Sequence, residues 1–317
     1  MPQPRFNLAG VVALTACLMS LGAAAEEDTR TESTPPTSYF AELGVGAEYD
    51  TNVTIDELDA STREGDSAVT VEGKLGMRTY FSPETDLRLT YDFNQDMYQD
   101  FSDLNRQTHI LGANLKTQAG RVDAGFSTFY VNSLLDGNGF LELYRASPYV
   151  SGFLSQKWFS RAAYVFSDKQ IKERAERDAT THTGEIDVYF FARGLRSYFN
   201  MGYRFRSEDA NLERLDFTSH AAKLRYIRRV DVGEKVLKLE MAYRYENRDY
   251  SGLTPGIGSI EGEQRRDERH RVQLDLEYPL SKQGALQLYF AYGDYRSNFQ
   301  ISDFEQGIVG SRYVYRW

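Results

Sequence analysis

Charged residues recur at every second position, or at multiples of it, in the second half of the chain. The basic ones are Arg204, Arg206, Lys223, Arg225, Lys238, Arg244 and Arg312, and the acidic ones are Glu240, Glu246, Asp275 and Glu277. Residues spaced by two point to the same face of a β-strand. If these faces surround water, neighbouring positive and negative walls would set up a field across a pore. The same charges could instead pair with each other and fill the interior, and the sequence leaves both possibilities open.

The histidines are the other candidates for chemistry, but their surroundings do not predict a reaction centre. His109, His182, His220 and His270 are scattered, and His182 and His270 lie near expected loop ends with acids nearby. The chain contains neither a Gly-x-Ser-x-Gly nor a His-Glu-x-x-His motif. We therefore predict that the protein is not an enzyme and that it has no catalytic residue, metal site or cofactor.

A cluster of acids lies between residues 50 and 66. It consists of Asp56, Glu57, Asp59, Glu64 and Asp66. Their spacing is not that of a calcium-binding loop. The pattern predicts a solvated acidic loop, and weak divalent-ion bridging to lipopolysaccharide is the alternative.

Composition narrows the class of protein. The chain has 317 residues, 22 tyrosines and 19 phenylalanines, yet its mean hydropathy is −0.54. A helical membrane protein needs apolar runs of about 20 residues. A transmembrane barrel needs only every second residue to be apolar. The net charge of −9 argues against nucleic acid as a partner, because an acidic surface repels phosphates.

Residues 1–25 are typical of a cleaved signal peptide. Arg5 precedes an apolar stretch, which ends at the small residues 23–25. Cys17, the single cysteine, lies inside this segment, where a lipoprotein-like sequence offers lipidation as an alternative. Residues 26–37 are polar and contain two prolines, and we predict a disordered periplasmic leader there.

From residue 38 onward the chain divides into about fourteen strand-like segments. We expect them at 38–49, 67–81, 86–101, 106–118, 121–134, 141–155, 158–171, 180–193, 196–207, 215–229, 235–249, 268–280, 284–297 and 304–317. Short turns alternate with longer polar loops, notably 50–66, 171–180, 207–215 and 250–267. This asymmetry is typical of outer-membrane barrels, and an even number of strands predicts that both termini are periplasmic.

Alternation within the segments predicts which face meets lipid. In 268–280, Val272, Leu274, Leu276 and Tyr278 alternate with Arg271, Gln273, Asp275 and Glu277. A register slip of one residue would move the charged set into lipid. The sequence thus predicts an all-β fold, in which residues 38–317 form a single transmembrane up-and-down antiparallel barrel in a Gram-negative outer membrane.

The last segment ends the chain with aromatic residues on one face. Tyr313, Tyr315 and Trp317 share that face, opposite Arg312 and Arg316. A final strand that ends in an aromatic residue resembles the signal by which the barrel assembly machinery recognises outer-membrane proteins. We predict that Tyr313, Tyr315 and Trp317 form this assembly signal.

The sequence also resembles the C-terminal barrel of surface lipoprotein assembly modifiers, the Slam family. The resemblance rests on residues 48–53 (Glu-Tyr-Asp-Thr-Asn-Val), 265–269 (Arg-Arg-Asp-Glu-Arg), 295–298 (Tyr-Arg-Ser-Asn) and the closing Trp317. It covers roughly residues 40–317 and implies a fourteen-strand barrel. The N-terminal tetratricopeptide domain of that family has no counterpart in the short leader.

Two functions follow as hypotheses, and a purely structural or adhesive role, suggested by the polar loops, is a third. The resemblance implies a conduit that translocates or displays a surface lipoprotein or secreted protein. The charged lumen argues instead for a porin-type passive channel for small, mildly anionic solutes. Expected partners are outer-membrane lipid and lipopolysaccharide, the barrel assembly machinery and a lipoprotein or secreted cargo, but not nucleic acid.

Overall fold

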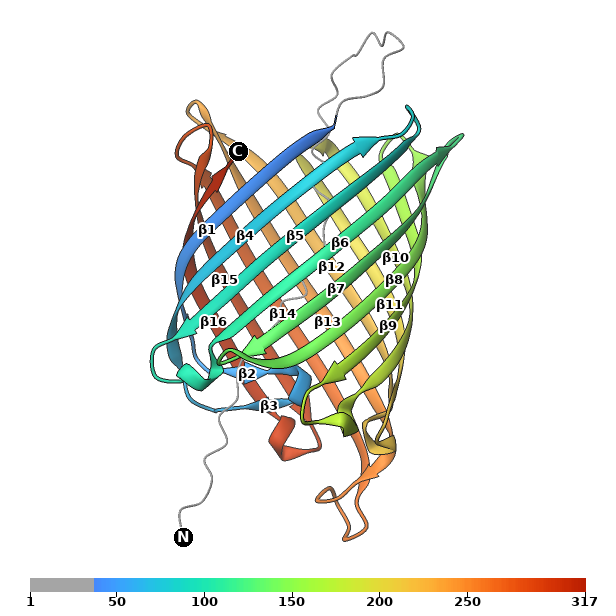
Figure 1. Ribbon diagram of the computed structural model, residues 1–317, viewed down its shortest axis with the longest axis vertical. Coiled ribbons are helices and arrows are strands. Elements are labelled where there is room, and N and C mark those ends of the chain that lie inside the picture. The colour runs from blue at the N-terminus through green and yellow to red at the C-terminus, as the bar shows by residue number, and fades with distance from the viewer. Residues whose placement is uncertain (1–36) are drawn as a thin grey trace.

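The chain forms a closed barrel of fourteen antiparallel strands in a computed structural model that describes residues 37–317 (Figure 1). The predicted signal peptide with Cys17, and all of the predicted leader except Thr37, lie outside these residues. The barrel strands are β1 (Ser38–Asp50), β4 (Asp66–Tyr80), β5 (Thr85–Tyr98), β6 (Arg106–Ala119), β7 (Val122–Leu135), β8 (Asn138–Ser155), β9 (Trp158–Ile171), β10 (Ala179–Leu195), β11 (Ser197–Ala210), β12 (Phe217–Val232), β13 (Lys235–Thr254), β14 (Glu263–Pro279), β15 (Gly284–Ser297) and β16 (Phe304–Arg316).

Pairing of the first strand with the last closes the sheet. Val45 on β1 lies opposite Tyr313 on β16, and Leu43 lies opposite Tyr315. Closure leaves no unpaired strand edge, which is what a sheet surrounded by lipid requires. The start of β1 and the end of β16 lie at the end of the barrel that carries the short turns (Figure 1). The fold and the strand number predicted from the sequence are confirmed.

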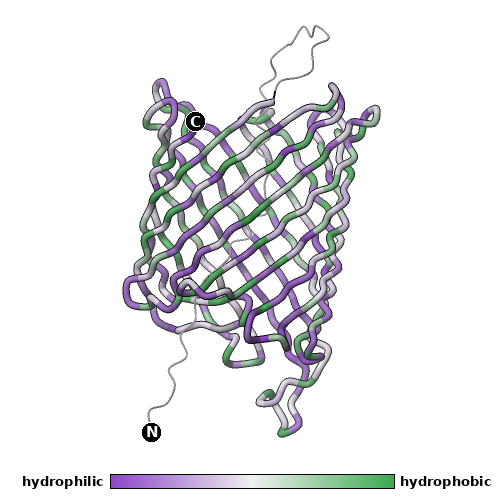
Figure 2. Tube along the Cα trace, viewed as in Figure 1, coloured by the Kyte–Doolittle hydropathy of each residue, from purple (hydrophilic) through white to green (hydrophobic). Residues whose placement is uncertain are grey.

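Apolar side chains face outward along the strands. Met241, Leu274, Phe290 and Val309 form one row across β13–β16, and 40–56% of each is exposed. Figure 2 shows polar and apolar residues alternating along the strands on the near side of the barrel. Exposed apolar area of this extent needs a non-aqueous partner, which lipid provides. Among residues 37–317, no helix is long and apolar enough to cross a bilayer.

The strands β13 and β14 extend beyond the expected segments. The polar stretch 250–267, expected as a loop, is in part a ribbon in which Leu253 pairs with Gln264 after a bulge. This expectation was wrong because alternation reports contact with lipid. Polar residues that project beyond the membrane form the same backbone ladder without that signal.

The acidic segment 50–66 folds into the mouth of the barrel. It carries two short strands, β2 (Thr54–Ile55) and β3 (Ala60–Ser61), joined by the 3₁₀ turn η1 (Asp56–Leu58), and we call residues 52–63 the inward hairpin. Val53, Thr54 and Ile55 are fully buried, and Ile55 packs in a cluster with Phe140 of β8. The expected solvated loop is therefore wrong. Apolar Val53 and Ile55 and the pairing of its acids with arginines bring this segment inside.

The remaining loops at this end are short. They contain the 3₁₀ turns η2 (Ser102–Leu104), η3 (Ala175–Arg177), η4 (Glu213–Leu215) and η5 (Gln300–Ser302). Two of these turns contact the inward hairpin: Arg177 of η3 pairs with Asp59, and the Ser302 hydroxyl of η5 donates to the Asp59 carbonyl. The lumen and its mouth are therefore the places where a function of this barrel can reside.

Candidate functional site: the lumen and its mouth

The predicted lumen residues lie on inward positions of the barrel wall, and most of them form ion pairs. On β10–β13, Arg204 lies 3.0 Å from Glu185, and Lys223 lies 2.6 Å from Asp187. Glu240 pairs with Arg225 and lies 3.3 Å from Lys238. Arg206 pairs with Glu246. Near the first strand, Arg312 pairs with Glu72, and Glu277 lies 2.9 Å from Arg316. The predicted basic residues are thus interleaved with acids along the wall. Two of these acids, Glu185 and Asp187, were not among the predicted lumen residues. Their inward, alternating positions on β10 are the signal that could have identified them.

Two like-charged pairs interrupt this pattern on β13 and β14. Arg244 lies directly opposite Arg271, and Glu240 lies directly opposite Asp275. Like charges at opposed positions destabilise a sheet.

A second charged wall escaped the sequence analysis. Glu48 and Asp50 of β1, Glu72 of β4 and Asp96 of β5 lie at inward positions toward the mouth. Glu48 accepts a hydrogen bond from Tyr289 at 2.8 Å, and Asp50 accepts one from Gln306 at 2.7 Å. In the order of strands, β4 and β5 lie across the barrel from β11 and β12. An acidic wall therefore faces the wall that carries the arginines.

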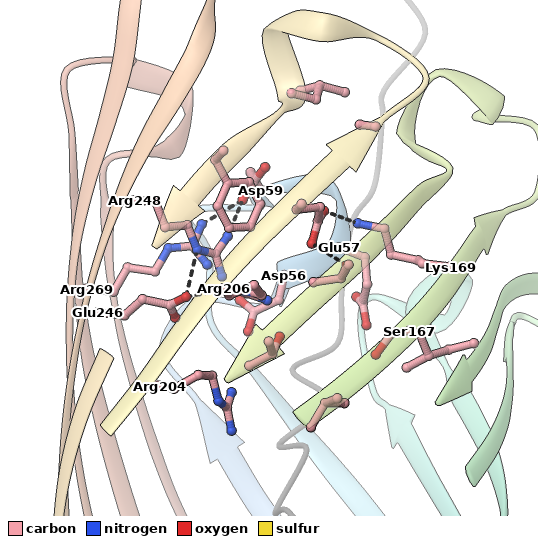
Figure 3. Close-up of a pocket in the computed structure, with 18 of the residues that line it drawn as sticks. Asp56, Glu57, Asp59, Ser167, Lys169, Arg204, Arg206, Glu246, Arg248 and Arg269 are labelled. Atoms are coloured by element: carbon pink, nitrogen blue, oxygen red, sulfur yellow. Dashed lines mark hydrogen bonds and ion pairs between the residues drawn. The ribbon is translucent and has the colours of Figure 1, made fainter. Parts of the chain in front are cut away.

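The inward hairpin is attached to the barrel wall by its acids (Figure 3). Asp59 lies 2.7 Å from Arg269, 3.3 Å from Arg265 and Arg177, and 3.8 Å from Arg248. Glu57 lies 2.8 Å from Arg106 of β6. These partners belong to β6, η3, β13 and β14, which lie around the circumference. The hairpin is thus held across the mouth and narrows it.

Asp59 titrates unusually because of these partners. Burial by itself would raise the pKa of its carboxyl, but the four arginines outweigh burial and hold the pKa well below its usual range. A carboxyl with a depressed folded-state pKa stabilises the folded form fully above its unfolded pKa, about 3.9, and loses that effect as the pH falls through the folded value.

We therefore expect the hairpin to stay docked when the pH is lowered from 7 to about 5, still above the unfolded-state value. Single-channel conductance measured across this range should keep one main level. A second, larger level that appears near pH 5 would contradict the ion-pair account.

Between the inward hairpin and the strands β8–β15 lies a cavity of about 340 Å³ (Figure 3). Nine arginine and lysine side chains and six carboxylates line it, among them Arg145, Arg204, Arg244, Glu185 and Asp56. The excess of basic groups favours anionic over cationic guests in the mouth. Within the described part of the chain, no group of three or more His, Cys, Asp or Glu residues could hold a metal ion.

The four histidines share one arrangement on the outer face. Tyrosine hydroxyls contact Nδ1 of His109, His182, His220 and His270 at 2.7, 2.5, 2.7 and 2.8 Å. A second aromatic ring lies directly opposite each histidine on the neighbouring strand; these rings are Phe93, Phe166, Phe205 and Tyr245. The sequence analysis saw only scattered histidines because strand pairing, not sequence distance, makes the repeat. They lie apart on different hairpins, so they do not form one reaction centre.

The predicted assembly signal lies at the seam of the barrel. Tyr313 and Tyr315 face Val45 and Leu43 of β1, the rings of Tyr315 and Trp317 pack at 4.8 Å, and the Trp317 amide donates to the Ala41 carbonyl at 3.0 Å. These residues therefore take part in closing the sheet, and their role as an assembly signal stays a prediction.

We expect removal of Tyr315–Trp317 to leave the protein unassembled in the periplasm. The truncation removes the aromatic end and the Arg316–Glu42 pair, whose atoms are 2.5 Å apart. Fractionation and a heat-modifiability gel would measure it, with Trp317→Phe as the matched control that should assemble. Normal assembly of the truncated chain would contradict the signal.

The chain matches no protein-family model and no curated protein. Among solved structures, in-vitro folded OmpT, an outer membrane protein of Vibrio cholerae, is similar with a TM-score of 0.53 and 11% identity, covering 89% of this chain and 97% of that one. A loop L8 deletion mutant of the same protein gives 0.52 and 10%, covering 89% and 99%. An anion-selective porin from Comamonas acidovorans gives 0.49 and 9%, covering 89% and 99%.

At these identities the OmpT structures carry the fold alone. The fourteen-strand barrel that the Slam resemblance implied is confirmed, but nothing specific to the Slam family is matched. The chain has the fold of an outer-membrane β-barrel.

Proposed function

We propose that the protein is a passive diffusion channel for small charged solutes across the outer membrane, narrowed at one end by the inward hairpin. The observation that carries the proposal is a lumen lined by ionised side chains and crossed by a hairpin that is attached through Asp59 and Glu57. Barrels of eight strands are filled by their side chains, and a wider one leaves room for water. We place the short turns and both ends of the barrel on the periplasmic side, as in barrels of this type.

Purified protein in a planar bilayer tests the proposal. We expect discrete conductance steps with a mild anion preference, because basic groups outnumber acids in the mouth cavity. The double variant Arg204→Glu, Arg225→Glu should shift the preference toward cations, since each change turns an ion pair into an acidic patch with Glu185 or Glu240. A correctly folded barrel that never conducts would overturn the proposal.

The second candidate is translocation or display of a surface lipoprotein or secreted protein. The Slam-like residues favour it, although some of these residues also make contacts that hold the barrel and the hairpin together. The Asn52 amide group donates to the Glu305 carbonyl at 2.8 Å, and Arg269 pairs with Asp59 of the hairpin. A polypeptide would need the hairpin to leave the mouth. This role predicts that a hairpin tethered to the wall by a disulfide blocks surface display of a co-expressed lipoprotein, and undiminished display would refute it.

We further propose that outer-leaflet lipid, including lipopolysaccharide, contacts the four tyrosine–histidine pairs on the outer face. With Nδ1 bonded to tyrosine, Nε2 of His182 and His220 is left for headgroup phosphates, and both residues are exposed. Replacing both by Phe should weaken the retention of lipopolysaccharide by purified barrel in a co-purification assay, and equal retention would refute the contact. The barrel assembly machinery is the partner proposed for the C-terminal strand. The proposal includes no catalysis and no cofactor.

A further inference from the structure

The lumen face of β13 and β14 carries charged residues, and ion pairs within the barrel wall neutralise only some of them. Going from the mouth toward the short-turn end, Arg244 faces Arg271, then Ala242 faces Gln273, then Glu240 faces Asp275. Two positive groups are thus separated from two negative groups by one small and one neutral side chain. All of these positions alternate with lipid-facing ones such as Leu274.

One member of each like-charged pair is compensated by its surroundings. Arg244 shares Glu246 with Arg206 and Arg248, and Glu240 is compensated by both Arg225 and Lys238. Among residues 37–317, by contrast, no hydrogen bond or ion pair within 4 Å joins a protein group to the side chain of Arg271 or of Asp275. An unpaired cation and an unpaired anion therefore lie on one strand and on the same face.

The surroundings of Arg271 are mainly basic and those of Asp275 are acidic, which would orient a bound solute that carries both charges. Arg271 and Gln273 line the mouth cavity, in which basic groups outnumber acids. Asp275 lies one inward position further and is exposed to the lumen, beside Glu240. Asp59, which also lines the cavity, is occupied by its four arginines. Asp56 remains as an acid near Arg271 that a bound carboxylate would have to face.

Spacing sets the size of the guest. Four residues along a strand correspond to about 13 Å between backbones. A polar contact of about 3 Å at each end takes up part of this distance, and an extended peptide spans about 3.3–3.6 Å per residue. A solute with one positive and one negative end, two to three residues long, fits better than a single α-amino acid, whose charges lie close together.

We propose that Arg271 and Asp275 form a two-ended site for extended zwitterions, such as short peptides with free termini. The carboxylate end binds at Arg271 beside Arg244, and the ammonium end binds at Asp275 beside Glu240. Because the groups face water, each contact is weak, as transit through a channel requires. This inference rests on the proposed channel function and names its substrate class.

Swelling of liposomes that contain the purified barrel tests the site. The solutes are triglycine, N-acetyl-triglycine, triglycine amide and N-acetyl-triglycine amide, which have similar sizes and carry both charges, one charge or none. We expect triglycine to enter roughly two- to fivefold faster than the doubly blocked peptide, the range given by a solvent-exposed ion pair. Arg271→Gln and Asp275→Asn should each remove most of this preference.

Charge changes elsewhere in the lumen provide the controls. Arg161→Gln on β9 and Asp123→Asn on β7 should keep the preference, because they alter lumen charge away from the two-ended site. Conductance in potassium chloride is measured on the same preparations. A conducting barrel that admits all four peptides equally, or that keeps its preference in both site variants, overturns the site and leaves the channel intact. The absence of conductance overturns the channel itself.

Discussion

Replacing Leu274 by arginine should abolish the folded, membrane-inserted form of the protein. Leu274 lies between Met241 and Phe290 in the outward apolar row, and 40% of it is exposed to the surroundings of the barrel. An arginine near the bilayer midplane costs about 2–4 kcal/mol. It also removes a leucine that packs on both neighbours. Cold-loaded gels of the membrane fraction should show no heat-modifiable band.

The adjacent residue provides the matched control. Gln273→Arg introduces the same side chain one position away, where it faces the lumen between Arg271 and Asp275. There it meets water and a carboxylate, so we expect a normal heat-modifiable band. Leu239→Arg on β13, which lies opposite Leu276, should fail as Leu274→Arg does. If all three variants behaved alike, the assignment of inner and outer faces would be wrong.

Sequence alone was enough to predict the barrel because the membrane imposes a strict period. The segments 158–171 and 284–297 coincide with β9 and β15, since lipid tolerates only one of the two possible registers. The ribbon formed by Leu253 and Gln264 could not be predicted in this way. It projects beyond the membrane, where backbone pairing needs no apolar alternation.

The candidate site was predictable only in part. The inward positions of Arg204, Arg225 and Glu240 follow from alternation, but their partners depend on which strands lie side by side and how far the side chains reach. The repeated tyrosine–histidine contacts are invisible for the same reason. Tyr203 and His220 are far apart in sequence and meet only through the register of β11 and β12.

The inward hairpin was the largest surprise, and its cause is electrostatic. A run of acids in a loop stays in water unless basic side chains elsewhere in the fold form ion pairs with it. Arg177, Arg248, Arg265 and Arg269 come from three separate parts of the chain, and only barrel closure brings them together around Asp59. Such convergence of long-range partners has no local sequence signal.

Asp59→Asn should release the inward hairpin from the mouth and produce the largest change in conduction of any single substitution. The change removes the one acid of the hairpin that contacts all four arginines, although three of them keep Asp267 or Glu246 as a partner in the barrel wall. Removing one partner of a buried ion pair costs about 3–5 kcal/mol. Asparagine keeps the left-handed backbone conformation of Asp59, whose φ is 51°, so the turn itself remains possible. The effect therefore comes from charge and not from the backbone.

With the hairpin undocked, the arginines line an open mouth, and we expect larger conductance steps and a stronger preference for anions. Planar-bilayer recordings in a salt gradient measure both quantities. Glu64→Gln is the matched control, since it removes one acid from the same loop at an exposed position and should leave conductance unchanged. If Asp59→Asn conducts like the unmodified protein while its barrel is folded, the hairpin is not held by these ion pairs, and packing of Val53 and Ile55 must hold it instead.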